Sequence, residues 1–281
     1  MMKMDSRTAP QTASSRQTLG GNFPPGLRLL GHTLSLAADI GALEECLALE
    51  RASGMLAPPS EGIHSPPAVP FCEFLMLRSG DDRLQAVSRL MRLDGGNPIG
   101  NPLASGRFHL SPLLTALRYS REGILEMGVP VFAPECDPSK GASLLWSGMI
   151  RYLERNGLGF VIGMESLSMA MEQAHAWPRL MESHGLPPEL EVETRSAWNP
   201  RDFQKSGSMG NGSLSATEVP ATDYAWSHLP PGFQEALRRG CRLACEPAFN
   251  GAAGCLEFVW VASRDMLESG DSEGWSGANR P

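Results

Sequence analysis

The stretch from Ile124 to Leu167 constrains the fold more than any other part of the chain. It contains an apolar run, a loop with Pro and Gly, a segment with apolar residues at helical spacing, and a second apolar run. This order is typical of a βαβ unit, in which a helix connects two parallel strands. Gly157 is expected to end the helix, which carries the basic residues Arg151 and Arg155 in its last turns.

The first expected strand, from Ile124 to Phe132, is interrupted by Glu126, Gly128 and Pro130. A central strand seldom contains a carboxylate, a Gly and a Pro so close together, because Pro lacks the N–H that the ladder needs and Gly weakens the strand. The interruptions therefore predict a bulge or an opened edge at which a ligand approaches the backbone.

Length and composition indicate a soluble, cytoplasmic protein. The chain has 281 residues, of which 42% are hydrophobic, so it can bury a full core in one large domain or two small ones. It contains no apolar run of the ~20 residues that span a bilayer, and its first twenty residues lack the apolar region of a secretory signal. The net charge of −7 argues against a broad nucleic-acid-binding surface.

No metal site and no disulfide are expected. The six cysteines include no CxxC pair, and the six histidines are scattered without the spacing of metal ligands. Cys241 and Cys245, four residues apart on an expected helix, are interpreted as buried thiols.

We expect a disordered tail over residues 1–25, one domain over 26–265 with a flexible insert at 204–222, and a polar C-terminal tail over 266–281. Asp39 is expected to cap the first helix. The other elements expected outside the βαβ unit are a strand over Leu27–Leu36, a helix over Asp39–Arg51, a hairpin of Phe71–Leu77 and Leu84–Leu93, a helix over Ser111–Tyr119, a helix over Met169–Ser183, a strand over Glu189–Ala197, a helix that begins at Pro231 and a strand over Cys255–Ala262.

The loop before the central helix suggests an anion site. A Walker loop is excluded, because it needs a Gly four residues before its Gly-Lys pair and Asp137 and Pro138 stand near that position. Backbone N–H groups from Ser139 to Ser143 at a helix N-terminus still suit a phosphate, with Lys140 adding charge. An ordinary β–α turn is the alternative.

Glu126 is the strongest candidate for chemistry. Burying a charged carboxylate costs several kcal/mol, so such a group is paired, has a raised pKa or lies at a cleft. A carboxylate with a raised pKa suits a general base that removes a proton from an amine. The alternative is a structural ion pair with an arginine such as Arg89. Trp146 is expected either to fill the core or to wall an acyl tunnel.

Two ordered sets of residues then point to a family. The first set is Glu126-Met127-Gly128, Pro134, Leu144-Leu145-Trp146-Ser147-Gly148 and Gly163-x-x-Ser166-Leu167. The second is Leu229-Pro230-Pro231, Leu237-Arg238-x-Gly240 and Glu246-Pro247-Ala248, and a weaker match covers Glu73–Leu77 and Ala86–Leu90. In this order they resemble the ornithine-lipid N-acyltransferases and hemolysin-like acyltransferases of the GNAT superfamily of N-acyltransferases. The resemblance covers about residues 26 to 265.

The resemblance implies an α/β (α+β) acyltransferase fold with a mixed, mainly antiparallel sheet, splayed at its middle and flanked by helices. It implies transfer of a fatty acyl group from the phosphopantetheine thioester of acyl carrier protein, or from acyl-CoA, to the amine of an amino acid such as ornithine. No bound cofactor is expected, and membrane contact would come through the products. By resemblance, the catalytic residues are Glu126 and Arg89, the donor-binding residues are Val131, Phe132, Lys140, Gly141, Ala142 and Trp146, and the acceptor-binding residues are Glu73 and Ser166.

The sequence departs from the family pattern at two basic positions. Val129 and Asp137 stand where the family carries arginines, and Lys140 lies close enough to replace one of them. Two alternatives to an acyl-carrier-protein-dependent enzyme follow. One is an inactive relative that binds the acyl chain or the carrier protein, and the other is a CoA-dependent N-acetyltransferase of small molecules.

Overall fold

The computed structural model describes residues 23–24, 26–53, 72–93, 108–118, 122–168, 177–187, 190, 192–194, 229, 231–245, 247–250 and 255–269. The expected loops at 54–70 and 95–106, the insert at 204–222 and nearly all of the tail at 1–25 lie outside these ranges.

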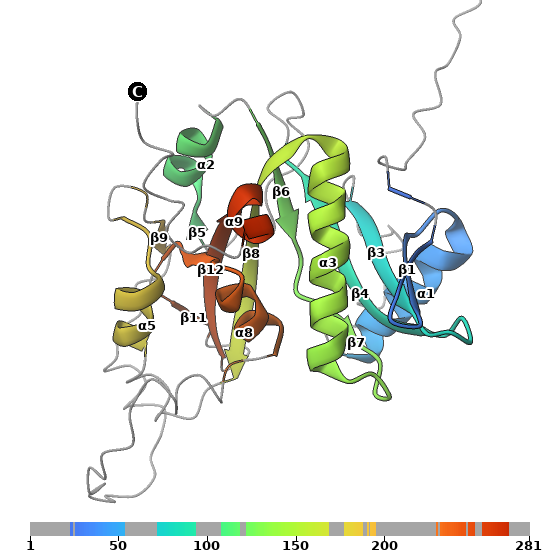
Figure 1. Cartoon of the computed structure of the whole chain (residues 1–281). Coiled ribbons are helices and arrows are strands. Elements are labelled where there is room, and N and C mark those ends of the chain that lie inside the picture. The colour runs from blue at the N-terminus through green and yellow to red at the C-terminus, as the bar shows by residue number, and fades with distance from the viewer. Residues whose placement is uncertain are drawn as a thin grey trace, which may run out of the picture.

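A ten-stranded sheet runs through the molecule (Figure 1). Along its main path it contains, in sheet order, β1 (Leu27–Leu29), β2 (His32–Leu36), β3 (Cys72–Arg78), β4 (Leu84–Arg92), β6 (Gly123–Met127), β8 (Leu158–Ser168), β12 (Cys255–Ser263) and β10 (Arg242–Leu243). Two short strands lie off this path: β7 (Val131–Phe132) pairs with β4, and β11 (Ala248–Asn250) pairs with β12. Among the described strands every strand-to-strand pairing is antiparallel except that of β6 with β8, and an isolated bridge between Gly185 and Leu243 is also parallel. The expected mixed, mainly antiparallel sheet flanked by helices is confirmed.

Six helices accompany the sheet in the described part of the chain. They are α1 (Ile40–Ala52), α2 (Ser111–Arg118), α3 (Pro138–Asn156), α5 (Trp177–His184), α8 (Pro231–Arg238) and α9 (Arg264–Ser269). A separate two-stranded sheet pairs β5 (Phe108–His109) with β9 (Glu193–Thr194).

The expected βαβ unit is confirmed as β6, α3 and β8, with the two strands parallel. Gly157 ends α3 with φ 64°, a left-handed conformation that costs Gly little, and its N–H donates to the carbonyls of Glu154 and Leu153. Figure 1 shows α3 crossing one side of the sheet. The side of the sheet that α3 covers is called the α3 face below, and the other side is called the α1 face.

Side chains on β3 show which helix covers which face. Leu75 lies against Gly148 of α3, where a Cβ would be 3.2 Å from the leucine side chain. Phe74, the preceding residue, clusters with Cys46 of α1. Because side chains alternate along a strand, the register of the pairings then assigns residues of the neighbouring strands to the α3 face or the α1 face.

Of two predictions for the N-terminal part of the domain, one is wrong and one is confirmed. Leu27–Leu36 is not one strand but a hairpin of β1 and β2, because Leu30 and Gly31 have φ 50° and 77° and form the tight turn that joins them. Asp39 caps α1 as expected, accepting a 2.8 Å hydrogen bond from the N–H of Ala42. The expected hairpin of β3 and β4 is also confirmed.

Several C-terminal predictions need correction. The helix expected over Met169–Ser183 is described only as α5, since β8 continues to Ser168 and residues 169–176 lie outside the described ranges. Of the stretch Glu189–Ala197, where a strand was expected, the structure describes residues 190 and 192–194, and only Glu193–Thr194 (β9) form a strand. Cys241 and Cys245 do not share a helix face, because α8 ends at Arg238; both are buried free thiols, as expected.

The expected polar tail begins with a helix. α9 starts directly after β12 and buries Met266 and Leu267. The hydroxyl of Ser263 accepts a 3.3 Å hydrogen bond from the N–H of Met266 and so caps the helix. The six-residue pattern is too short for its apolar spacing to be recognised in the sequence.

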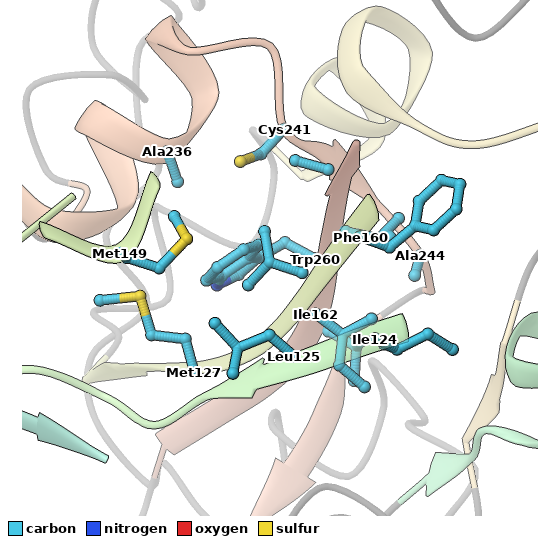
Figure 2. Packing of buried hydrophobic residues seen from close by; sticks show 14 of the residues in the cluster. Ile124, Leu125, Met127, Met149, Phe160, Ile162, Ala236, Cys241, Ala244 and Trp260 are labelled. Carbon is cyan, nitrogen blue, oxygen red and sulfur yellow. The ribbon is translucent and has the colours of Figure 1, made fainter. Parts of the chain in front are cut away.

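The core on the α3 face centres on two tryptophans. The rings of Trp146 on α3 and Trp260 on β12 lie with centroids 5.1 Å apart, and Figure 2 shows Met127, Met149 and Leu125 around Trp260. Both tryptophans are almost fully buried. In the described part of the chain, no helix is long and apolar enough to cross a membrane.

Candidate active site

A bulge interrupts the central strand at the position that the sequence suggested. Leu90 of β4 pairs with Met127, whereas Val87 pairs with Val131. Three steps along β4 therefore face four steps along the partner, so one extra residue lies between Met127 and Val131. The predicted bulge is confirmed.

Backbone hydrogen bonds locate the bulge more closely. The N–H of Gly128 donates to the carbonyl of Arg89 at 2.8 Å, and the carbonyl of Gly128 accepts from the hydroxyl of Ser88 at 2.9 Å. Pro130 has no N–H to offer. Within the described residues, no hydrogen bond is recorded for the N–H of Val129. The extra residue therefore leaves one backbone N–H, that of Val129, available as a hydrogen-bond donor near the centre of the sheet.

β6 and β8 separate close to the N–H of Val129. Their last pair is Met127 with Gly163. Beyond it, β7 stays with β4, and the second half of β8, from Met164 to Ser168, stays with β12 (Figure 1). Among the described strands, none pairs with the other edge of Met164–Ser168. We call this region, from Met127 to Val131 and from Gly163 to Ser168, the strand divergence.

Glu126 lies one residue before the end of β6, between Met91 of β4 and Ile162 of β8. It is 2% exposed. The next residue, Met127, pairs with Gly163, and the indole of Trp260 fills the space beside Gly163 on the α3 face. Met127 therefore lies on the α3 face. Because side chains alternate along a strand, Glu126 points to the α1 face. The expectation of a buried carboxylate inside the strand is met.

Arg89 does not pair with Glu126. Its guanidinium forms a two-pronged ion pair with Glu50 of α1, with Nε 2.7 Å from Oε1 and Nη2 2.6 Å from Oε2. It also lies 5.3 Å from the ring centroid of Phe74. The interpretation of Arg89 as the partner of Glu126 is therefore wrong, because α1 brings a nearer carboxylate over the same face.

The structure adds a carboxylate that the sequence analysis did not single out. Glu165 of β8 is 6% exposed, and burial alone raises the pKa of its carboxyl from 4.5 to about 8. In the described part of the chain no hydrogen bond or ion pair to it is recorded. The sequence signal was a Glu inside the apolar run of a second central strand, the same signal that selected Glu126.

The N-terminus of α3 is closed by its own cap. The carboxylate of Asp137 accepts hydrogen bonds from the N–H groups of Ser139 at 2.9 Å and Lys140 at 3.4 Å. The N–H of Gly141 donates to the backbone carbonyl of Asp137 at 2.8 Å. The donors expected to hold a phosphate are thus already used in this structure, and an acidic group occupies the position where the phosphate would lie. The side chain of Lys140 is exposed.

The other residues expected to bind the donor are distributed around the start of α3. Phe132 and Cys136 pack so closely against Gly141 that a Cβ there would lie 2.9 Å from each of them. Ala142 and Trp146 are buried in the core on the α3 face, whereas Val131 clusters with α1 residues on the α1 face. Trp146 thus fills the core by packing on Trp260.

The two residues expected to bind the acceptor lie apart. Glu73 of β3 accepts a hydrogen bond from the hydroxyl of Tyr152 on α3, so it lies on the α3 face. Ser166 lies on β8 beyond the last pair with β6, opposite Glu257 of β12, and is partly exposed. Ser166 and Val131 belong to the strand divergence, Glu126 and Phe132 adjoin it along the chain, and the backbone of Arg89 contacts it through Gly128. Within the described residues, no group of three metal-ligating side chains is present.

Comparisons with known proteins were made on sequence and on structure. No family model and no curated protein sequence matches the chain. Six chains of solved structures are similar to it, FeeM and BjaI among them. FeeM, an N-acyl amino acid synthase from uncultured soil microbes, aligns with a TM-score of 0.45 and 10% identity over 85% of this chain and 93% of its own. BjaI, a CoA-dependent acyl-homoserine lactone synthase solved with SAM and isopentyl-CoA, aligns with a TM-score of 0.35 and 13% identity over 81% of this chain and 76% of its own.

Proposed function

We propose that this protein is an N-acyltransferase that moves an acyl group from a thioester to the amine of an amino acid. The observation that carries the proposal is the strand divergence, where a bulge on one strand, an open strand edge on the other and a buried glutamate meet. Two of the motifs that resemble the GNAT superfamily, Glu126-Met127-Gly128 and Gly163-x-x-Ser166-Leu167, fall at this position.

The open edge of Met164–Ser168 suits an extended donor. A strand edge offers N–H and carbonyl groups at regular spacing, and a linear chain with amide groups can add to it as a further strand. Five residues of strand extend about 16 Å, which is enough for a long, amide-containing arm such as phosphopantetheine. The thioester at the end of such an arm would then reach the bulge.

The bulge supplies what the thioester carbonyl needs. Attack by an amine converts that carbonyl oxygen into an oxyanion, which a fixed backbone N–H stabilises. In this proposal the donor is the N–H of Val129. Glu126, one position before the last paired residue of β6, accepts the proton of the attacking amine.

For the donor we propose an acyl carrier protein. A free acyl-CoA needs a site for its pyrophosphate, and the carboxylate of Asp137 at the N-terminus of α3 disfavours an anion there. A carrier protein holds the phosphate of the phosphopantetheine arm on its own surface, so its binding depends less on a phosphate site at the N-terminus of α3. For the acceptor we propose an amino acid, with ornithine as the first compound to test.

The experiment is a matched set of acyl-transfer assays. The purified chain is incubated with long-chain acyl carrier protein or with acyl-CoA, and with ornithine or other amino acids, and the N-acyl product is measured by mass spectrometry. We expect product with the carrier-protein donor and a loss of roughly 100-fold in the Glu126→Gln variant. Turnover that is equal in wild type and variant would exclude Glu126 as the base, and no product with any donor would contradict the function.

A non-catalytic binding protein is the second candidate, favoured by Val129 and Asp137 at the two positions where the related motifs carry arginine. This candidate predicts that the chain binds acyl carrier protein, measured by calorimetry, without forming an amide under any of the assay conditions. A shift of the melting temperature with CoA, but not with carrier protein, would instead favour a CoA-dependent acetyltransferase.

A further inference from the structure

We infer that Glu165 is the general acid that protonates the departing sulfur of the acyl donor, so that the reaction uses two glutamates on opposite faces of the sheet. The inference rests on the proposed function, and it assigns a role to a residue for which the sequence motifs gave none.

Glu165 lies close to the point at which β6 and β8 part. Glu165 follows Gly163 by two residues on β8, and Gly163 forms the last pair with β6. Glu165 is therefore the first residue after the last β6–β8 pair whose side chain points to the α3 face. Had the strands remained paired, its neighbour would have been the bulge residue Val129. A group bound between the bulge and β8 thus lies beside the carboxyl.

The neighbours of Glu165 on the α3 face of β12 are apolar. Phe258 pairs with Glu165 across β12, and its ring lies 4.4 Å, centroid to centroid, from that of Phe233 on α8. Trp260, two residues further along β12, covers Gly163. Apolar side chains of β12 therefore lie next to Glu165, and burial is the sole cause of its raised pKa. A buried carboxyl that no ion pair compensates costs stability, and such groups cluster at functional sites.

The ionisable groups on the surrounding elements do not set this pKa. Glu126 on β6 and Glu257 on β12 point to the α1 face by strand alternation. On the α3 face, the hydroxyl of Tyr152 donates to Glu73, and Glu235 of α8 is paired with Arg238 and Arg239. Lys140 near the start of α3 is exposed, and Arg264 at the start of α9 lies close to Glu122, Asp265 and Glu268.

The step balances as follows. The amine nitrogen forms a bond to the thioester carbonyl carbon, and Glu126 accepts a proton from the nitrogen. The tetrahedral intermediate then breaks its C–S bond, the electron pair stays on sulfur, and Glu165 donates its proton to that sulfur. The products are an amide and a free thiol, with Glu126 protonated and Glu165 ionised. Exchange with water restores both carboxyls for the next turnover.

The pKa of Glu165 is close to that of a thiol leaving group. A thiol has a pKa of about 8.5, and proton transfer in a transition state is most effective when the two pKa values are close. Burial brings the pKa of Glu165 to about 8, so the side chain is mostly protonated at neutral pH. An ordinary surface glutamate would have lost its proton at that pH and could not act as the acid.

The test varies the leaving group. Wild type, Glu165→Gln and Glu165→Asp are assayed with a pantetheine thioester and with an aryl thioester, whose more acidic thiol leaves without protonation. We expect Glu165→Gln to lose about 100-fold with the pantetheine donor and to approach wild type with the aryl donor. Glu165→Asp should recover part of the rate. Glu154→Gln, which removes a carboxylate of a surface ion pair on α3, serves as the control and should leave both rates unchanged.

The outcomes separate the inference from the proposed function. If wild type acylates the amine and Glu165→Gln is equally fast, or is slowed equally with both donors, the general-acid role is excluded while the function stands. If wild type makes no amide from either donor, the proposed function fails and the inference fails with it. Infrared spectroscopy gives an independent readout: a protonated carboxyl band at neutral pH should disappear in Glu165→Gln, and an unchanged band would contradict the inference. Circular dichroism confirms that each variant is folded.

Discussion

The indole of Trp260 lies over the backbone of Gly163, its partner on the neighbouring strand, in the space where a side chain would project. A Cβ built on Gly163 would lie 2.1 Å from Cζ2 of the indole. The same indole packs on Trp146 of α3, so it connects the helix to the sheet. Gly163 is also the last residue of β8 that pairs with β6. The core packing therefore coincides with the point at which the two strands part.

Gly163→Ala should destabilise the protein. The added methyl must displace the indole, and overpacking of a filled core costs about 1–3 kcal/mol or more. The free energy of unfolding, measured by urea denaturation, gives the cost. Gly41→Ala on α1 is the matched control, because a Cβ there meets its nearest atom at 3.4 Å, an ordinary contact. A Gly163→Ala variant as stable as the control would mean that the indole moves without cost.

Removal of Arg89 should reduce stability through Glu50. The carboxylate of Glu50 is 5% exposed and forms a two-pronged ion pair with the guanidinium. Loss of one partner from a buried ion pair leaves a buried charge and costs about 3–5 kcal/mol. We expect Arg89→Met alone to lower the free energy of unfolding by that amount, and the double variant with Glu50→Gln to recover a large part of it. Additive losses in this double-mutant cycle would contradict the pairing.

Glu165 should make stability depend on pH. The pKa of its carboxyl is raised from 4.5 to about 8 by burial, so between these values the folded state keeps a proton that the unfolded state releases. Stability from this group is fully present below about pH 4.5 and is lost as the pH rises toward 8. Glu165→Gln should therefore be more stable than wild type between pH 5 and pH 8. The difference in the free energy of unfolding should grow by about 1.4 kcal/mol for each pH unit in this range.

Chemical denaturation of both proteins at pH 5, 6.5 and 8 measures this difference. Comparison with wild type at each pH cancels the contributions of the other ionisable groups. A difference between variant and wild type that stays constant across the range would show that Glu165 is ionised in the folded protein.

Asp137→Asn should strengthen the binding of phosphate-containing donors. Asn can still cap α3, but it removes a negative charge from the N-terminus of the helix, where an anion is otherwise favoured. We expect the Kd for CoA, measured by calorimetry, to fall several-fold. Asp39→Asn makes the same change at the cap of α1 and should leave the Kd unchanged. Equal affinities for all three proteins would mean that the donor phosphate binds away from α3.

Local sequence patterns predicted much of the fold, because helix ends and strand interruptions depend on interactions between residues close together in the sequence. Asp39 caps α1 and Gly157 ends α3, since each effect involves a few consecutive residues. The bulge between Met127 and Val131 could also be predicted, because a Gly and a Pro in a central strand disturb its ladder whatever the neighbouring strand is. The hairpin at Leu30 and Gly31 was missed, since Leu rarely adopts a positive φ.

The candidate site was predicted only in part. Glu126 was recognisable as a carboxylate in an apolar strand, and it is buried as expected. Its proposed partner was wrong because Arg89 pairs with a residue 39 positions away in the sequence. The N–H groups at the start of α3 predicted an anion site or an ordinary turn. The structure shows that Asp137 already accepts hydrogen bonds from two of these groups.

Residues close together in the sequence specify the βαβ unit, its helix ends and the interruption of its first strand, so these features could be predicted. Which residues meet across the strand divergence depends instead on how distant segments pack. Strand register and helix packing bury Glu126 on the α1 face and Glu165 on the α3 face, and burial raises the pKa of Glu165. Such effects arise from contacts between segments far apart in the chain, whose pairing no local pattern encodes.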